Sequence, residues 1–294
     1  MEDFKHGILI VDKPKGITSH DVVDIARKAL KTRRIGHIGT LDPNATGVLV
    51  LCVNNATKLV KYFTEHSKTY RAELILGKKT DSDDITGKVV EEVDACHLTR
   101  EQVVEALMAF KGKYLQTPPK FSAIKVNGIK LYELARRDVP IHQIEPREVE
   151  IYGIEDIEIL ETGQVWKIMA TLRVSKGTYI RSIARDLGEK LGVVGTLGDL
   201  RRLEIENFHI KDAVSIETLK TSKVELKDPF QYLNMQTLVV DERARSYIEN
   251  GRFLALELFK EKTDTIIYSS DGQVLAIYYY DKDRDVMRMS VKWC

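Results

Sequence analysis

The sequence predicts a protein of the α+β class, with a mixed α/β core and a small β-rich domain toward its C-terminal end. Short apolar runs such as Ile8–Val11 and Val48–Val53 are typical of buried strands. Apolar residues three or four positions apart, as at Val103, Leu107 and Phe110, are typical of helices. Because strands and helices do not alternate regularly, a fold built of repeated βαβ units is disfavoured.

Length and composition are those of an ordinary globular protein. The 294 residues suffice for a full core and a small second domain, and 43% of them are hydrophobic and 30% charged. The longest apolar runs are too short to span a bilayer, and the charged start Met1–Lys5 is unlike a secretory signal. The cysteines at Cys52, Cys96 and Cys294 share no disulfide or metal-binding spacing. We therefore expect a cytoplasmic protein without a membrane segment.

Charge is unevenly distributed along a chain whose net charge is only +1. Four basic residues and no acidic ones lie between Lys28 and His37. The stretch Lys111–Arg147 holds eight Lys or Arg and three Asp or Glu, and the same numbers recur in Lys167–Arg202. Such segments either solvate helices and loops or together form a basic face that binds the phosphates of a nucleic acid.

In the first half of the chain, turn and capping residues separate the expected elements. The strand Ile8–Val11 is ended by Lys13–Gly16. Thr18 and Asp21 have the spacing of a capping box, and the apolar positions that follow predict a helix to Leu30. The remaining elements in this half are a glycine-rich loop at Gly36–Gly47, the strand Val48–Val53, a helix at Lys58–Thr64 and a strand at Thr69–Leu76.

The second half contains paired strands, further helices and a domain boundary. Gly112 and Gly192 are expected at the ends of helices, where glycine readily adopts the left-handed conformation. Asp228-Pro229 marks the boundary, and Asp271-Gly272 predicts a hairpin beyond it. The expected elements are a helix at Val103–Phe110, paired strands at Glu148–Leu160 and Val165–Ser175, a helix at Tyr179–Leu191, and a strand and helix within Val239–Asn250.

Several familiar motifs carry no function in our interpretation. The Asn-x-Thr sequons at Asn44 and Asn55 have no meaning without secretion. Asp81–Asp84 resembles the start of a calcium loop, but Ile85 and Thr86 stand where a ligand and a glycine are needed. A polar turn that begins a hairpin is expected there instead. The histidines have no pair with the spacing of a zinc site, and we expect no metal.

The segment Gly36–Gly47 places a single acid, Asp42, among glycines, after a basic stretch and before a buried strand. Glycines allow a backbone to approach a large ligand closely, and Pro43 restricts the conformation of Asp42. On this chemistry alone, an Asp-Pro turn without function is the more common outcome. A nucleotide-binding loop is disfavoured because no Lys-Ser/Thr follows the glycines.

Several separate segments together resemble the bacterial tRNA pseudouridine-55 synthases of the TruB type. Gly36–Gly47 is similar to the nucleophile loop of that family, whose catalytic aspartate falls on Asp42. The resemblance covers nearly the whole chain and keeps the family's order of motifs. The other motifs are Asp12–Gly16, which resembles the Lys-Pro motif that supports the loop, the segment around Tyr70, Ser175–Arg181, Leu200–Leu203, and Phe121–Lys125 with Leu131–Glu133.

The resemblance implies an isomerase that flips a tRNA uridine out of its stack and converts it to pseudouridine. This reaction is redox-neutral and loses no group, so no cofactor is expected. Asp42 would be the nucleophile, attacking C1′ of the ribose or C6 of the base, and Arg181 would pair with it and favour its ionised form. Tyr70 would stack on the flipped base and is considered for proton movement at C5, although a half-buried strand tyrosine has the same pattern.

Further contacts with the RNA are implied in the same way. His37 would contact the RNA or fill the gap left by the flipped base, unless it is a loop histidine bonded to the backbone. Tyr179 belongs to the Ser175–Arg181 motif. The remaining expected substrate-binding residues are Lys13, Leu200, Arg201 and Lys125.

The resemblance also divides the chain into two predicted domains. Residues 1–232 would form the catalytic domain, a central mixed sheet flanked by helices, with a thumb-like RNA-binding insertion at about 117–147. Residues 233–294 resemble a PUA domain, a small RNA-binding module. The expected partner is the T-stem-loop of tRNA, bound by a monomer without a guide RNA. A guide-dependent synthase remains an alternative, as does a non-catalytic protein that binds or folds tRNA. A tRNA-folding function could also coexist with the modifying activity.

Overall fold

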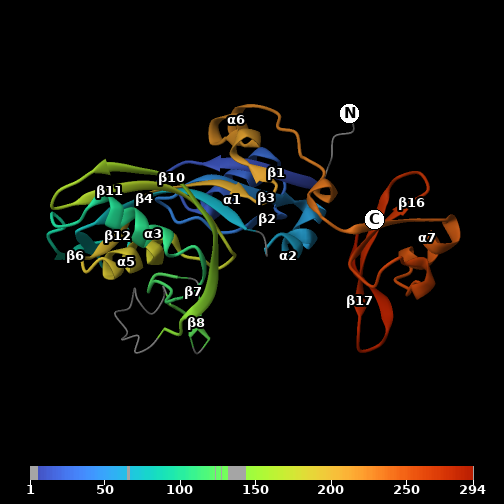
Figure 1. The fold of residues 1–294 in the computed structure, drawn as a ribbon. Coiled ribbons are helices and arrows are strands. Elements are labelled where there is room, and N and C mark those ends of the chain that lie inside the picture. The colour runs from blue at the N-terminus through green and yellow to red at the C-terminus, as the bar shows by residue number, and fades with distance from the viewer. Residues whose placement is uncertain (1–5, 65–66, 123, 127, 132–143, 294) are drawn as a thin grey trace.

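The computed structural model describes residues 6–64, 67–122, 124–126, 128–131 and 144–293. Tyr132 and the rest of 132–143, in the predicted insertion, lie outside these ranges. Figure 1 shows a large sheet with helices packed on it and a smaller sheet toward the C-terminal end of the chain. The structure therefore has the mixed α/β class that the sequence predicts.

The large sheet is built from strands of both halves of the chain. Its strands are β1 (Gly7–Lys13), β2 (Ile35–Ile38), β3 (Thr46–Val53), β4 (Lys68–Leu76), β7 (Gly112–Gln116), β10 (Arg147–Glu161), β11 (Trp166–Val174), β12 (Gly195–Ile205), β13 (Phe208–His209) and β14 (Val214–Ser215). Their order is β14-β1-β3-β12-β4-β11-β10-β7, with β2 beside β3 and β13 beside β12. Strand β12 runs parallel to β3 and antiparallel to β4, so it joins the N-terminal strands to the antiparallel group that follows.

Two helices of the described chain begin with a capping box, and the sequence predicts the first of them. Thr18 and Asp21 form the predicted capping box of α1, in which the Thr18 main-chain N–H donates to Asp21 at 2.7 Å. Thr99 and Gln102 form a second box before α3. The helices are α1 (Ser19–Ala29), α2 (Val60–Phe63), α3 (Arg100–Met108), α5 (Ile180–Lys190), α6 (Ile216–Thr221) and α7 (Glu242–Glu249), with 3-10 turns at Asn54–Leu59, Ile210–Asp212, Pro229–Tyr232 and Leu256–Leu258.

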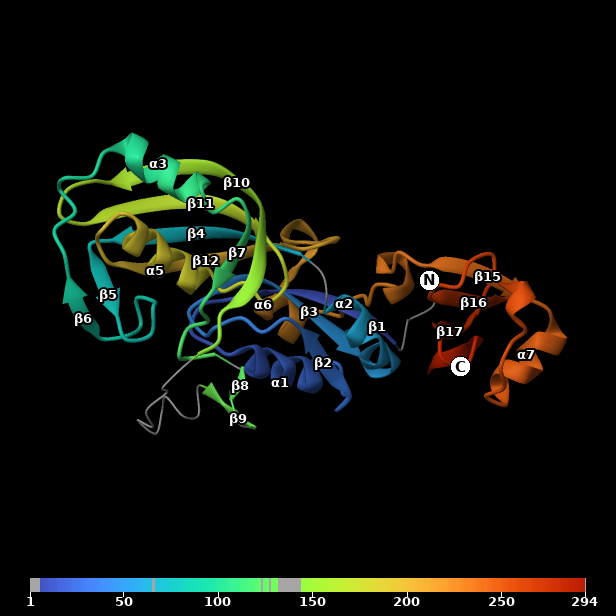
Figure 2. The same ribbon diagram turned by 60° about the horizontal axis from the view of Figure 1, so that its bottom comes forward.

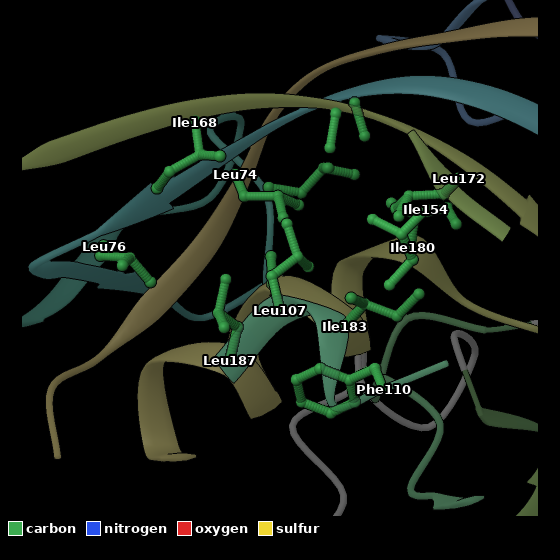
Figure 3. Close-up of a cluster of buried hydrophobic side chains, with 14 of the residues drawn as sticks. Leu74, Leu76, Leu107, Phe110, Ile154, Ile168, Leu172, Ile180, Ile183 and Leu187 are labelled. Carbon is green, nitrogen blue, oxygen red and sulfur yellow. The ribbon is translucent and has the colours of Figure 1, made fainter. Parts of the chain in front are cut away.

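Helices α3 and α5 pack against the antiparallel part of the large sheet (Figure 2). Leu107 of α3 and Ile183 of α5 point toward Leu74 of β4 and Ile168 of β11 (Figure 3). Each of these four side chains is fully buried. Burying one such side chain is worth about 1.5–3 kcal/mol, so this cluster fixes α5, and with it Arg181, against the strands.

The N-terminal part of the sheet is covered on both faces. Leu49 and Leu51 of β3 pack with α1 and α6 in one cluster, whereas Val48 and Val50 face a second cluster that contains Phe63. Alternate residues of a strand point to opposite faces, so a strand buried on both sides reads as a continuous apolar run. This explains why Val48–Val53 could be recognised in the sequence.

The second sheet lies beyond the predicted boundary. Its strands are β15 (Gln236–Val240), β16 (Thr265–Ser269), β17 (Val274–Asp281) and β18 (Val286–Lys292), in that order. The predicted hairpin at Asp271-Gly272 is confirmed, since β16 and β17 pair antiparallel around it. This sheet shares a core with the first: Ile266, Ile277 and Val291 belong to the same buried cluster as Ile8 and Phe63.

Two elements of the large sheet differ from the sequence prediction. The glycine-rich loop was expected to begin at Gly36, but Ile35–Ile38 is strand β2, which pairs with Val50–Val53 of β3. Strand β12 was not predicted, because Gly195–Ile205 contains four charged residues and two glycines, a composition that resembles a loop. The expected polar turn at Asp81–Asp84 is confirmed: it begins a hairpin of β5 (Lys78–Thr80) and β6 (Val89–Glu92).

Candidate active site

The loop that carries Asp42 connects β2 to β3 and is shaped by two glycines. Gly39 has a φ of +69° and Gly47 a φ of +102°, a region that side chains rarely adopt. A Cβ on Gly47 would lie 2.1 Å from the carbonyl oxygen of Arg202, so only glycine fits against β12 at this point. The glycines singled out in the sequence therefore bring the loop close to the neighbouring strand.

Lys13 holds the loop from the side of β1. Its buried Nζ donates to the carbonyl oxygens of Pro14 at 2.9 Å, Ile17 at 2.7 Å and Pro43 at 3.2 Å. Burial lowers the pKa of Lys13 to about 8, and the nearby carboxylate of Asp42 opposes part of that shift. The ammonium is thus engaged with the backbone of the loop, which fits the loop-supporting role implied by the resemblance better than a direct contact with substrate.

Ser19, at the start of α1, is a second support of the loop. The N–H of Leu41 donates to Ser19 Oγ at 2.9 Å, and Ser19 Oγ donates to the carbonyl oxygen of Leu41 at 3.1 Å. The side chains of Ser19 and Leu41 are both buried. The residue just before Asp42 is therefore fixed at its N–H and its carbonyl, which leaves the carboxylate little freedom to move with the loop.

Asp42 and Arg181 form an ion pair, with 3.1 Å between Asp42 Oδ2 and Arg181 Nη2. Arg181 lies in the first turn of α5, and its side chain is only 7% exposed, whereas that of Asp42 is 44% exposed. Arg181 also donates to the carbonyl oxygens of Ser82 at 3.2 Å and Phe121 at 2.9 Å. A fixed, buried guanidinium thus holds a carboxylate that remains accessible.

Tyr70 lies in β4 and is 8% exposed. Its side chain belongs to the same buried cluster as Leu41 and Ala45, which flank Asp42 in the loop. Tyr70 is also the register partner of Arg202 in β12. The structure thus places the tyrosine beside the loop that carries Asp42, and this position is compatible with both the core and the base-stacking interpretations.

The three residues Leu200, Arg201 and Arg202 in β12 alternate between the faces of the sheet. Leu200 packs against the cluster that contains Tyr70. Arg201 pairs with Asp12 at 2.7 Å and is 41% exposed. Arg202, which the sequence reasoning did not select, is 1% exposed and donates to the carbonyl oxygen of Gly39. Recognising β12 as a strand would have placed Arg202 on the interior face, one position beyond the arginine that was chosen.

His37 and Tyr179 lie at different margins of the site. His37 is half-buried in β2, and burial lowers its pKa, with the charge of Arg202 acting in the same direction. Its Nδ1 is buried without a hydrogen-bond partner among the described residues. Tyr179 precedes α5, where its N–H donates to Gln116 Oε1 at 2.8 Å and its carbonyl accepts from Gln116 Nε2 at 3.1 Å. Burial raises the pKa of Tyr179.

Arg185, one turn after Arg181, anchors the root of the predicted insertion. It donates to the carbonyl oxygen of Thr117 at 2.8 Å and pairs with Asp186 at 2.7 Å and Asp83 at 3.3 Å. Burial raises the pKa of both aspartates, against the lowering effect of Arg185. The sequence offered no signal for this cluster, because its members come from a hairpin turn and a helix that are far apart in the chain.

The insertion itself is described in part. Lys125 lies in β8 (Lys125–Val126), which pairs with β9 (Ile129–Lys130), and the position of its side chain is outside the described part of the structure. Its contact with RNA stays a prediction. Within the described ranges, no group of three or more His, Cys, Asp or Glu side chains is arranged to hold a metal ion. No helix among the described residues is long and apolar enough to cross a membrane.

Comparison with known families decides what this site belongs to. Residues 27–180 match the model of the TruB family pseudouridylate synthase N-terminal domain, and residues 181–240 match that of the tRNA pseudouridylate synthase B C-terminal domain. The chain belongs to the TruB family of pseudouridylate synthases. Asp42 and Tyr70 fall in the first match, and Arg181 and Arg202 fall in the second, whereas Lys13 and Ser19 lie before the matched residues.

Curated relatives agree with this membership of the TruB family. Proteins named tRNA pseudouridine synthase B are 38% identical in Caldanaerobacter subterraneus subsp. tengcongensis, over 92% of this chain and 94% of the relative, and 40% identical in Thermosipho melanesiensis, over 92% and 87%. A solved structure titled as a Cbf5-Nop10-Gar1 complex matches 99% of this chain and 85% of its own with a TM-score of 0.70. At 22% identity, this last likeness shows a shared fold.

Proposed function

We propose that this TruB-family protein converts the T-loop uridine at position 55 of tRNA to pseudouridine, with Asp42 as the nucleophile. The observation that carries the proposal is the pair of Asp42 and Arg181, 3.1 Å apart, in which the carboxylate is accessible and the guanidinium is buried. A carboxylate can attach covalently to its substrate and leave again, as this reaction requires. The names of the curated relatives support tRNA as the substrate.

The chemistry breaks the bond from uracil N1 to ribose C1′ and forms a bond from C5 to C1′. Asp42 attacks C1′ or C6, and expulsion of its carboxylate in a later step restores the free enzyme. The proton on C5 is lost and N1 gains one, so atoms and charge balance without a cofactor. Arg181 holds the carboxylate in place for this attack through their ion pair.

Base flipping gives Tyr70 its proposed role. Extruding a stacked uridine costs a few kcal/mol, and stacking on an aromatic ring returns roughly 1–3 kcal/mol. Tyr70 is suited to this because its strand is fixed by pairing with both β11 and β12. The neighbouring apolar residue Leu200 would complete the wall. His37, Tyr179 and Arg201 lie around this region and are proposed to contact the RNA outside the reacting base.

The proposed RNA grip lies in the insertion at about 117–147. The root of this segment is bonded to α5 through Thr117 and Phe121, so RNA held there is held near Asp42. Residues 233–294 carry nine basic and ten acidic residues, and the PUA-like contribution we propose for them therefore rests on shape and hydrogen bonding. We propose that the protein acts in the cytoplasm as a monomer and without a guide RNA, since the insertion offers its own RNA-binding surface.

The test replaces Asp42 by asparagine, which keeps the size of the side chain but removes the nucleophile. Pseudouridine formation at position 55 of an unmodified tRNA transcript should be lost, and the affinity for that transcript should stay the same. Asp24→Asn is the matched control, because Asp24 lies on the exposed side of α1 and pairs with Arg27 there. Product formation by Asp42→Asn at the wild-type rate would refute the proposed mechanism.

A further inference from the structure

Arg202 is a fully buried arginine in the middle of the large sheet, 1% exposed. Taking a guanidinium out of water is costly unless its donors are satisfied. Its donors go to main-chain oxygens: Nε donates to Val48 at 2.8 Å, Nη2 to Gly39 at 2.8 Å and Nη1 to Thr40 at 3.5 Å. Within the described chain it forms no ion pair. Its guanidinium instead donates hydrogen bonds to the backbone of the Asp42 loop and of β3.

Both ends of the Asp42 loop meet this one residue. At the start of the loop, a Cβ on Gly39 would lie 3.3 Å from Arg202 Nη1. At its end, Gly47 is the register partner of Arg202, and a Cβ there would lie 2.1 Å from the Arg202 carbonyl oxygen. The segment between the two glycines contains Asp42. It is therefore contacted by the side chain of Arg202 at one end and by the main chain of Arg202 at the other.

The same residue also joins the loop to the strand that carries Tyr70. In the antiparallel ladder of β12 and β4, Arg202 pairs with Tyr70. In the parallel ladder of β12 and β3, it pairs with Gly47. The relative place of the Asp42 loop and Tyr70 is thus determined through Arg202. A substrate uridine that stacks on Tyr70 must present its reacting carbon to Asp42. A displacement of the Asp42 loop relative to Tyr70 therefore changes the geometry of the attack.

We propose that Arg202 is a positioning residue for the reaction, which sets the place of Asp42 relative to the flipped base. This inference rests on the proposed function, in which Asp42 is the nucleophile. Arg202 does not touch the substrate; it acts through the carbonyl groups of Gly39 and Thr40. A displacement of reacting groups by 1 Å can cost about 10²-fold in rate, so the contribution is large although the residue lies behind the site.

Lysine cannot replace arginine in this arrangement. The planar guanidinium presents donors in a fixed fork that reaches carbonyls on either side, whereas an ammonium is a single point at the end of a flexible chain. Arg202→Lys therefore keeps the charge and most of the volume but loses the simultaneous contacts with Val48 and Gly39. A residue of purely structural importance would lower stability, but it would not separate the rate of the chemical step from RNA binding.

The experiment measures single-turnover pseudouridine formation with saturating enzyme, dissociation constants for the same tRNA transcript, and thermal melting, for Arg202→Lys and Arg202→Gln. We expect the single-turnover rate of Arg202→Lys to fall about 10²-fold while its affinity and melting temperature stay close to wild type. Arg71→Lys is the matched control. Arg71 lies in β4 beside Tyr70, on the opposite face, and also donates to a carbonyl, that of Asp156 at 2.7 Å.

A folded Arg202→Lys with the wild-type single-turnover rate overturns the inference, and so does a rate loss fully explained by weaker binding. If both variants fail to fold, Gly39→Ala disturbs the same contact from the loop side, and it must show the same loss of rate at unchanged affinity. Asp42→Asn is measured alongside. An active Asp42→Asn would refute the proposed function itself. An inactive Asp42→Asn together with a wild-type rate for Arg202→Lys would refute only the inference about Arg202.

Discussion

The guanidinium of Arg181 holds the carboxylate of Asp42 at 3.1 Å while it also donates to two main-chain carbonyls. The accessible partner of the pair is therefore fixed by the buried one. One of those carbonyls belongs to Phe121 at the root of the insertion, so the proposed RNA-binding segment and the proposed nucleophile both contact Arg181. This arrangement makes the pair a sensitive target for substitution.

Replacing Arg181 by lysine should reduce turnover strongly although the charge is kept. The lysine can reach only one of the three acceptors, because it lacks the fork of the guanidinium. We expect a loss on the order of 10²-fold in single-turnover rate, as for other fixed donors in closed sites. Arg173→Lys, an exposed arginine of β11, is the control. Equal rates for Arg181→Lys and wild type would show that the pair has no role in the reaction.

Two substitutions of Tyr70 separate its proposed roles. Tyr70→Phe keeps the aromatic ring, so stacking on the flipped base should persist. Tyr70→Leu removes the ring, and we expect a loss of about 1–3 kcal/mol in the stability of the flipped state. If the hydroxyl moves the C5 proton, Tyr70→Phe binds normally and a covalent or rearranged intermediate accumulates in rapid-quench experiments. Normal turnover by Tyr70→Phe would instead leave stacking as the sole contribution.

Lys13 should make the free energy of unfolding depend on pH in the alkaline range. Burial lowers its pKa from 10.5 to about 8, so below pH 8 the fold carries the full cost of a buried cation. Between about pH 8 and 10.5 the folded protein has lost a proton that the unfolded chain still binds. The free energy of unfolding should therefore rise with pH in this window relative to Lys13→Met. Urea unfolding of both proteins across the window measures the difference, and parallel curves would contradict it.

Removing Pro119–Pro146 should weaken tRNA binding without unfolding the core of the catalytic sheet. Gln116 and Arg147 are register partners in β7 and β10, so a short Asn-Gly linker after Pro118 can reconnect the two strands. We expect a lower affinity and a shallower dependence of log K on log salt, because basic contacts to phosphates are lost. An unchanged affinity and salt slope would place the RNA grip elsewhere. Circular dichroism of the shortened chain shows whether the core is retained.

The elements that the sequence predicted best are those with a local signal. The capping box at Thr18 and the hairpin at Asp271-Gly272 need only neighbouring residues, and both are confirmed. Strand β12 was missed because it owes its place to partners on both sides, which allow a strand with arginines and glycines to be buried. Arg202 escaped notice for the same reason: the role we propose for it depends on its contact with Gly39, which is distant in sequence.

The same limit applies to the site. Nothing in the residues alone distinguished Asp42 from an ordinary Asp-Pro turn, and the family resemblance selected it. The structure adds the geometry, in which Asp42 pairs with Arg181 while Leu41 and Ala45 of the same loop pack in one buried cluster with Tyr70. Contacts such as that of Arg185 with Asp83 could not be predicted, because their partners meet only after the sheet has formed.

The core that the two sheets share has a mechanical consequence. Phe230 and Trp293 pack edge to face at 4.7 Å, and Tyr62 of α2 bonds to Ser290 of β18 at 2.6 Å. Apolar packing and hydrogen bonds at this contact restrict movement of the C-terminal sheet relative to the large sheet. Any part of an RNA that contacts the C-terminal sheet is then held at a fixed distance from Asp42. If the C-terminal sheet binds RNA as we propose, we expect the protein to select the uridine whose distance from that contact matches the fixed distance to Asp42.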